Sequence, residues 1–156
     1  MEEKGADLRG GETYSKKAAM RTVLFACVHN AGRSQMAAAF FNALADPMKA
    51  RAISAGTEPA ARVHPEVVDA MREVGIDLSQ ARPARLTEEL ARQAQLLVTM
   101  GCGEACPLVA GLRREDWPLG DPKGQSPEHV RSIRDDIRTR VERLLDEAGW
   151  RWLGNR

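Results

Sequence analysis

The sequence lacks an excess charge of either sign and any long apolar run. Its 23 lysines and arginines nearly balance 22 aspartates and glutamates, so charge gives no reason to expect nucleic acid or an anionic membrane as a partner. No apolar run reaches the length that spans a bilayer, and residues 1–19 lack the apolar core of a signal peptide. We therefore expect a cytoplasmic protein that binds neither nucleic acid nor membranes.

Cysteine is also scarce, with three in 156 residues. In a reducing compartment, so few cysteines indicate redox or metal chemistry rather than structural cross-links. The length suits one domain, and 43% hydrophobic residues supply a core. We expect a disordered polar tail over residues 1–20, a single domain over 21–150 and a short C-terminal tail over 151–156.

The segment from Thr22 to Phe40 carries the main signal. Its apolar run 23–26 predicts a buried strand, and the helical spacing of apolar residues after Arg33 predicts a helix. Cys27 therefore lies on a strand-to-helix turn, where free backbone N–H groups and the helix dipole favour a bound anion and a thiolate. We expect Cys27 to be a reactive cysteine rather than a buried one.

The residues that follow Cys27 suit an oxyanion-binding loop. Asn30 and Gly32 tolerate positive φ, so the loop can curl until its amides face one point. Arg33 adds a planar guanidinium for two oxygens of a tetrahedral anion, and Ser34 can donate a hydrogen bond to the sulfur or the ligand. A cysteine, five residues, then Arg-Ser is a strong signal, and the predicted loop comprises Val28, His29, Asn30, Ala31, Gly32, Arg33 and Ser34.

Short apolar runs predict three further strands, at residues 51–56, 96–100 and about 116–119. Helices are predicted to begin at Pro65, after Thr87 and at Pro127. This alternation predicts an α/β fold with an open, mostly parallel four-stranded sheet flanked by helices. Ligands of such sheets bind at the carboxyl ends of the strands, where the cysteine of the loop is expected.

The other two cysteines, Cys102 and Cys106, follow the third predicted strand and should open on the same side of the sheet as Cys27. Flanking Gly and Pro suit a mobile segment, which disulfide transfer among three sulfurs requires. Two structural alternatives stay open. The pair could bind zinc with histidine ligands, although a second cysteine pair is lacking, or it could be inert at the strand end.

An Asp-Pro pair, Asp121 and Pro122, follows the last predicted strand and would face the loop. A carboxyl group beside an oxyanion site can protonate the oxygen that leaves when the thiolate attacks. We predict Asp121 as the general acid, although an isolated Asp-Pro pair is more often a structural turn.

These motifs resemble the low-molecular-weight tyrosine phosphatase family and, within it, the thioredoxin-linked arsenate reductases. The run CVHNAGRSQMA is similar to the family's phosphate loop, and Arg-Ser-Gln-Met is closer to the reductases, because the phosphatases usually carry Arg-Ser-Pro. The resemblance covers residues 22–145. It implies a phosphatase-like fold with Cys27 as nucleophile, Arg33 as oxyanion clamp and Asp121 as acid.

The resemblance also implies a thiol relay. Cys102 would attack the Cys27–arsenate adduct and release arsenite, and Cys106 would then attack Cys102. Family members usually separate their second and third cysteines by more residues, so Cys106 or a small external thiol could attack the adduct instead. No cofactor or metal is expected to be bound. The implied reductant is thioredoxin, or mycothiol or glutathione with a glutaredoxin-like protein, and phosphate or sulfate would compete with arsenate.

Two other functions stay open. The first is a low-molecular-weight protein tyrosine phosphatase or a small phosphate-monoester phosphatase. The tyrosine phosphatases of the family usually place tyrosines after the Asp-Pro pair, whereas Lys123 follows here and the single tyrosine, Tyr14, lies in the tail. An aromatic substrate would therefore have little to stack on. The second is a non-enzymatic sensor that binds oxyanions or is oxidised without turnover.

Overall fold

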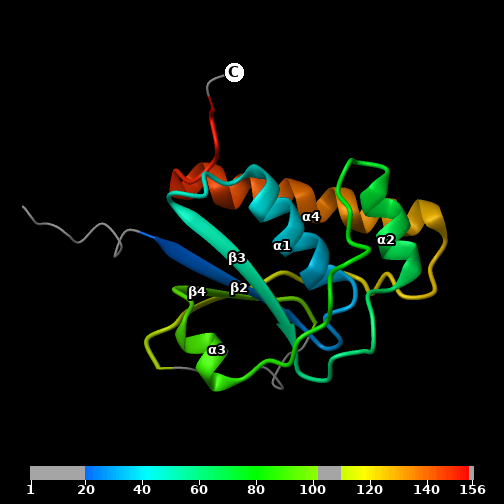
Figure 1. The fold of residues 1–156 in the computed structure, drawn as a ribbon, viewed down its shortest axis with the longest axis horizontal. Helices are drawn as coiled ribbons and strands as arrows, with labels where there is room; N and C mark the ends of the chain where they lie inside the picture. Colours follow the sequence, from blue (N-terminus) through cyan, green and yellow to red (C-terminus); the bar gives the residue numbers. More distant parts are fainter. Residues whose placement is uncertain (1–19, 102–109, 155–156) are drawn as a thin grey trace, which may run out of the picture.

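The structure is a computed structural model that describes residues 20–101 and 110–154. The predicted relay cysteines Cys102 and Cys106 lie outside the described residues, as does nearly all of the predicted N-terminal tail. Figure 1 shows a single sheet with helices on both faces. Within the described ranges, no helix combines the length and the apolar character that crossing a bilayer requires.

Within the described residues, the sheet has four strands in the order β3-β2-β4-β5, and every pairing between them is parallel. The strands are β2 (Arg21–Cys27), β3 (Ala50–Gly56), β4 (Leu96–Thr99) and β5 (Arg113–Asp116). The two central strands are buried almost throughout, whereas β5 at the edge consists of charged residues. An open, parallel, four-stranded α/β sheet is thus confirmed.

Helices α1 (Arg33–Leu44), α2 (Pro65–Arg72) and α4 (Pro127–Ala148) cover one face of the sheet, and the short helix α3 (Glu88–Arg92) covers the other (Figure 1). Side chains alternate along β2, so that Phe25 packs in the core under α1 and α4 while Leu24 packs in the smaller core under α3. A strand buried on both faces needs an uninterrupted apolar sequence.

The predicted helix starts are confirmed. Thr87 caps α3 by accepting a hydrogen bond from the Leu90 amide at 3.0 Å, and Ser126 caps α4 by accepting one from the His129 amide at 3.2 Å. Helix α4 ends at Gly149, whose φ of +75° is the left-handed conformation that glycine adopts most readily. The chain then turns back to the end of α1, with residue 151 bridged to residue 45.

The position predicted for the fourth strand was wrong, because β5 ends at Asp116, where the predicted strand began. Beyond it, Trp117 turns into the core, with its ring 5.6 Å from that of Phe25, and Pro118 has no N–H to donate. An edge strand needs only one neighbour and little burial, so β5 lacks the apolar run by which strands are recognised.

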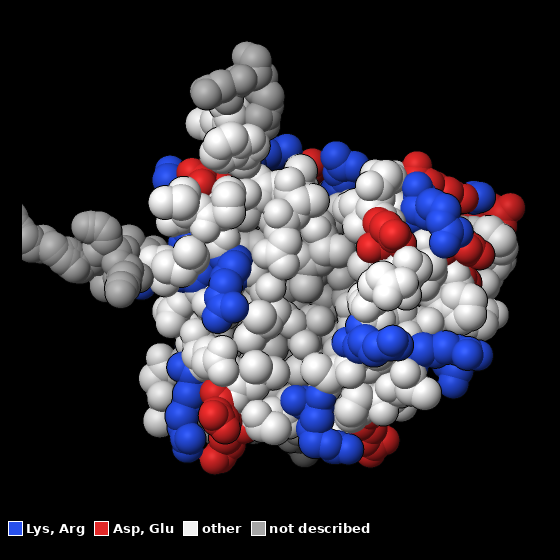
Figure 2. All heavy atoms as spheres, in the orientation of Figure 1, with Lys and Arg blue, Asp and Glu red and all other residues white. Residues whose placement is uncertain are grey.

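Charges of both signs are interspersed over the face shown in Figure 2, around an uncharged centre. This distribution agrees with the formal net charge of +1. Any attraction for an anion on this chain must therefore be local to a site.

Candidate active site

The predicted oxyanion loop leaves the carboxyl end of β2 at Cys27 and enters α1 at Arg33. Cys27 is paired with Gly56 at the end of β3. A Cβ at residue 56 would lie 2.6 Å from the carbonyl oxygen of Val28 and 2.9 Å from the amide nitrogen of Asn30. Only glycine therefore lets the loop pack this closely on the end of β3.

Residues 57–64 fix the backbone of the loop from outside. Four loop carbonyls accept hydrogen bonds of 2.8 to 3.2 Å from amides of this segment, and the pairs are Cys27 with Thr57, Val28 with Glu58, His29 with Ala60 and Ala31 with His64. All described peptide bonds are trans, so each N–H points opposite to the carbonyl of its own peptide unit. The N–H groups of residues 28–30 and 32 therefore face the inner side of the loop, where an anion would bind.

A short hydrogen-bond chain ends on the sulfur of Cys27. The Nδ2 of Asn30 donates to the hydroxyl oxygen of Ser34 at 2.7 Å, and this oxygen lies 2.9 Å from the Cys27 Sγ. Because Asn30 supplies a proton to the oxygen, the hydroxyl proton of Ser34 remains available to the sulfur. The Ser34 hydroxyl is thus placed to donate a hydrogen bond to the Cys27 sulfur.

The expectation that Cys27 is not buried was wrong, since only 2% of its surface is exposed. It is the last residue of a central strand, and the loop curls over it against the end of β3. The hydroxyl of Ser34, which is fully buried, is therefore its immediate polar neighbour.

Arg33 lies where three segments converge. Its Nη1 donates to the carbonyl oxygen of Leu119 at 3.0 Å, and its Nη2 lies 4.0 Å from the Asp121 carboxylate. On the third side, a Cβ at Gly101 would come within 2.5 Å of Nη1. The guanidinium side chain is 11% exposed and the Asp121 side chain 51%, so the predicted clamp and acid meet at the mouth of the loop.

The Asp121 turn packs on the loop itself. A Cβ at Gly32 would lie 2.8 Å from the Pro122 ring and 3.6 Å from the His64 ring. The turn is also anchored to α2, because the Gly124 amide donates to the Glu66 carboxylate at 2.6 Å, and this hydrogen bond is the main cause of the lowered pKa of Glu66.

Two contributors to the site were missed from the sequence. His64 forms part of the loop rim, and burial lowers its pKa despite the opposing charges of Glu66 and Asp121. Gln35 is 6% exposed and bonds to Asn30. The only sequence signal for His64 was the His-Pro start of a helix, and Gln35 stood out only as a departure from Arg-Ser-Pro.

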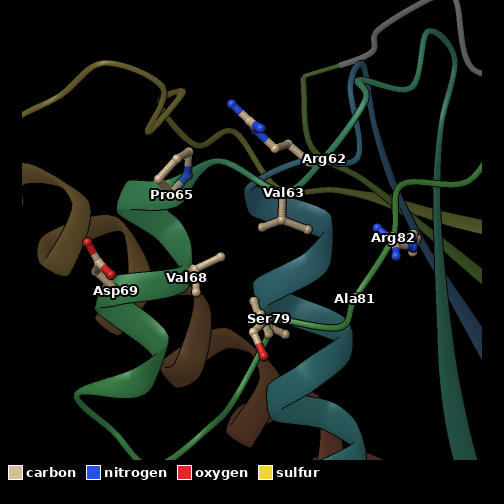
Figure 3. A pocket seen from close by; sticks show the side chains of 9 residues that line it. Arg62, Val63, Pro65, Val68, Asp69, Ser79, Ala81 and Arg82 are labelled. Carbon is tan, nitrogen blue, oxygen red and sulfur yellow. The ribbon is translucent and has the colours of Figure 1, made fainter.

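His29 is half-buried, and its Nδ1 lies 3.0 Å from the carbonyl oxygen of Glu58. No described group of three or more His, Cys, Asp or Glu residues could hold a metal, and the zinc alternative depends on cysteines outside these residues. A cavity of about 410 Å³ lies beside α2, between Val63, Val68 and Ser79 (Figure 3), and no residue of the loop lines it.

Residues 22–149 match the family model of low molecular weight phosphotyrosine protein phosphatases. A Halobacterium salinarum protein assigned as an arsenate reductase is 42% identical over 129 residues, which are 79% of this chain and 89% of that protein. The glutaredoxin arsenate reductase of Synechocystis sp. is 38% identical over 129 residues, which are 81% of this chain and 97% of that protein.

Among solved structures, the thioredoxin-dependent arsenate reductase of Corynebacterium glutamicum superimposes with a TM-score of 0.73 and 36% sequence identity. The match covers 85% of this chain and 63% of the other, so this chain spans under two thirds of that structure's length.

Proposed function

Because the chain belongs to the low molecular weight phosphotyrosine protein phosphatase family, we propose that it reduces arsenate to arsenite for arsenic detoxification. The observation that carries the proposal is the buried Cys27 sulfur, 2.9 Å from the Ser34 hydroxyl, within a loop whose amides face inward beside Arg33. The relatives at 42% and 38% identity are named for the same activity.

The first step is attack of the Cys27 thiolate on the arsenic of arsenate. The inner amides of the loop and Arg33 bind the arsenate oxygens, and Asp121 protonates the one that leaves, so that it departs as water. An As–S bond forms, an As–O bond breaks and arsenic stays pentavalent. The position of Asp121 beside Arg33 at the mouth of the loop supports its assignment as the acid.

The second step is reductive. The thiolate of Cys102 attacks the Cys27 sulfur, the As–S bond breaks, and its electron pair leaves with arsenic as arsenite. Cys106 then attacks Cys102, which frees Cys27 and leaves a Cys102–Cys106 disulfide. Support comes from Gly101, which lies against Arg33 and is followed directly by Cys102.

We propose that an external thiol reductant reduces the final disulfide. Thioredoxin is the first candidate, and glutaredoxin with glutathione or mycothiol is the second. The names of two similar proteins, one thioredoxin-dependent and one a glutaredoxin arsenate reductase, support a thiol donor of this kind. We further propose that the protein acts in the cytoplasm and that residues 1–20 are a dispensable tail.

A phosphatase is the second candidate, because Cys27, Arg33 and Asp121 are all that phosphate-monoester hydrolysis requires. The residues after Asp121 and Pro122 are Lys, Gly and Gln, with no aromatic side chain to hold a phenyl ring. Arsenate needs only the loop and the guanidinium, so the reductase is favoured.

The test is arsenate-dependent NADPH oxidation with thioredoxin and thioredoxin reductase. The wild type is compared with Cys27→Ser, Cys102→Ser and Cys106→Ser, and hydrolysis of p-nitrophenyl phosphate is measured on the same four proteins. Loss of reduction in all three variants is expected. If only Cys27→Ser loses arsenate reduction, an external thiol rather than Cys102 and Cys106 attacks the adduct.

Two results would overturn the reductase. A wild type that hydrolyses the phosphate ester but never reduces arsenate, with either thioredoxin or glutaredoxin as donor, is a phosphatase. A wild type that binds arsenate or is oxidised without turnover of either substrate is a sensor.

A further inference from the structure

The buried amide of Gln35 links the oxyanion loop to a segment far along the chain. Its Nε2 lies 3.1 Å from the carbonyl oxygen of Asn30, 3.2 Å from the Asn30 Oδ1 and 3.2 Å from the carbonyl oxygen of Arg82. The extended segment that carries Arg82 runs past α1 (Figure 3). Since all three neighbours are acceptors, the donor end of the amide must face them.

The direction of the hydrogen-bond chain is fixed by a backbone group. The Ala84 amide donates to the Asn30 Oδ1 at 2.8 Å, and a backbone N–H has no other role than donor. The oxygen of the Asn30 side chain therefore faces Ala84 and Gln35, and its nitrogen faces Ser34. Only in this orientation does Ser34 accept from Asn30 and keep its own proton for Cys27.

Asn30 needs such support, because its φ of +50° makes it the one non-glycine residue with positive φ in the described part of the chain. Asparagine adopts that conformation more readily than most residues with a side chain, but less readily than glycine. Gln35 holds its backbone carbonyl and its side-chain oxygen at once, and no other described hydrogen bond reaches that carbonyl.

The direction in which Gln35 reaches is also unusual for its place in the helix. A glutamine at the third helical position commonly accepts from the amide of the N-cap residue, here Gly32. In this chain the amide instead donates to Asn30. The Gly32 N–H is thereby left for a bound anion.

We propose that Gln35 is a positioning residue that acts through Asn30 to hold the Ser34 hydroxyl as a donor to Cys27, and so raises the fraction of Cys27 present as thiolate. The inference rests on the proposed function only in taking Cys27 as the nucleophile. The charged and titratable groups that surround this end of the sheet, Arg33, Asp121, His29 and His64, are left unchanged by substitution at residue 35.

The experiment uses the full chain with Cys102→Ser and Cys106→Ser, in which Cys27 is the remaining cysteine. The midpoint of its thiolate ultraviolet absorbance is followed against pH. Gln35→Met keeps the volume and removes the donor, and we expect the midpoint to rise by about one pH unit, a tenfold loss of thiolate below it. If Gln35→Met does not fold, Gln35→Asn is used in its place. Asparagine keeps the amide on a shorter side chain and should shift the midpoint in the same direction.

Asn42→Leu is the matched control. Asn42 is a second amide of α1 that bonds to backbone, donating to the Ala52 carbonyl at 3.0 Å and accepting from the Ala52 amide at 2.8 Å, with no contact to the loop. It should destabilise the fold and leave the thiolate midpoint in place. An equal shift in Asn42→Leu and Gln35→Met would reduce Gln35 to a general structural role.

Asn30→Ala tests whether Gln35 acts on Cys27 through Asn30. If Gln35 acts through Asn30, adding Gln35→Met to Asn30→Ala changes the midpoint no further. Additive shifts, or an unmoved midpoint in the folded single variant, overturn the inference. Failure of Cys27 as the proposed nucleophile would be a separate result. It would be seen if the protein that retains Gln35 already had the thiolate midpoint of a free cysteine, at about pH 8.5.

Discussion

Gly56→Ala should displace the oxyanion loop without removing any side chain of the site. The new Cβ would meet the Val28 carbonyl oxygen at 2.6 Å and the Asn30 nitrogen at 2.9 Å. Relaxed carbon–oxygen contacts begin at about 3.3 Å, so backbone must move by roughly 0.7 Å. Both neighbours are main-chain atoms, and no side chain can turn away to absorb the shift.

The magnitude follows from this displacement. Overpacking of this kind costs roughly 1 to 3 kcal/mol of stability, and a shift approaching 1 Å in a catalytic site costs on the order of 100-fold in rate. We therefore expect kcat/KM for arsenate to fall by about 100-fold, while urea still gives a single unfolding transition. The assay is the coupled NADPH oxidation described above.

Gly75→Ala is the control for this prediction. Gly75 has a φ of +83° and open space where a Cβ would be, so alanine there introduces backbone strain without a clash and lies outside the site. It should lower stability and leave turnover intact. A Gly56→Ala protein with wild-type kcat/KM would refute the argument that the end of β3 sets the position of the loop.

Three further predictions concern the rest of the molecule. Gly101→Ala, at a φ of +94° and with its Cβ 2.5 Å from the Arg33 Nη1, should raise KM for arsenate at least about tenfold in steady-state assays, as expected when a charged hydrogen bond is displaced. The pKa of Glu73 is lowered from 4.5 to about 2 by its hydrogen bonds to Arg131 and Arg134. The ionised Glu73 therefore contributes its full stabilisation above pH 4.5, and this is lost as the pH falls toward 2. The unfolding free energies of the wild type and Glu73→Gln, measured by urea titration, should converge over that window. At high salt they should converge at a higher pH. Removal of residues 1–19 should leave turnover unchanged, and lost activity would contradict their assignment as a tail.

The sequence was informative where structure is set by near neighbours along the chain. The strand that leads into Cys27, the helix after it and the helix starts after Thr87 and at Pro127 are all encoded within a few residues, and the structure has them where they were predicted. A buried central strand and a capped helix each carry a local pattern.

What could not be predicted depends on contacts between distant residues. Cys27 is buried because it ends a central strand and the loop curls over it against the end of β3. Gln35 matters because the segment at Arg82 and Ala84 returns to the loop. The edge strand β5 is charged and has one neighbour, so no local pattern marks it. The roles predicted for Cys102 and Cys106 remain predictions, because both residues lie outside the described part of the chain.

The segment 57–64, which occupies the outward carbonyls of the loop, has a thermodynamic consequence. The loop acquires its shape when the protein folds, so an arriving oxyanion exchanges with water and orders no further backbone. Little apolar surface is covered in the process. Calorimetry with phosphate should therefore record a heat-capacity change close to zero, unlike the large negative value of a loop that folds around its ligand.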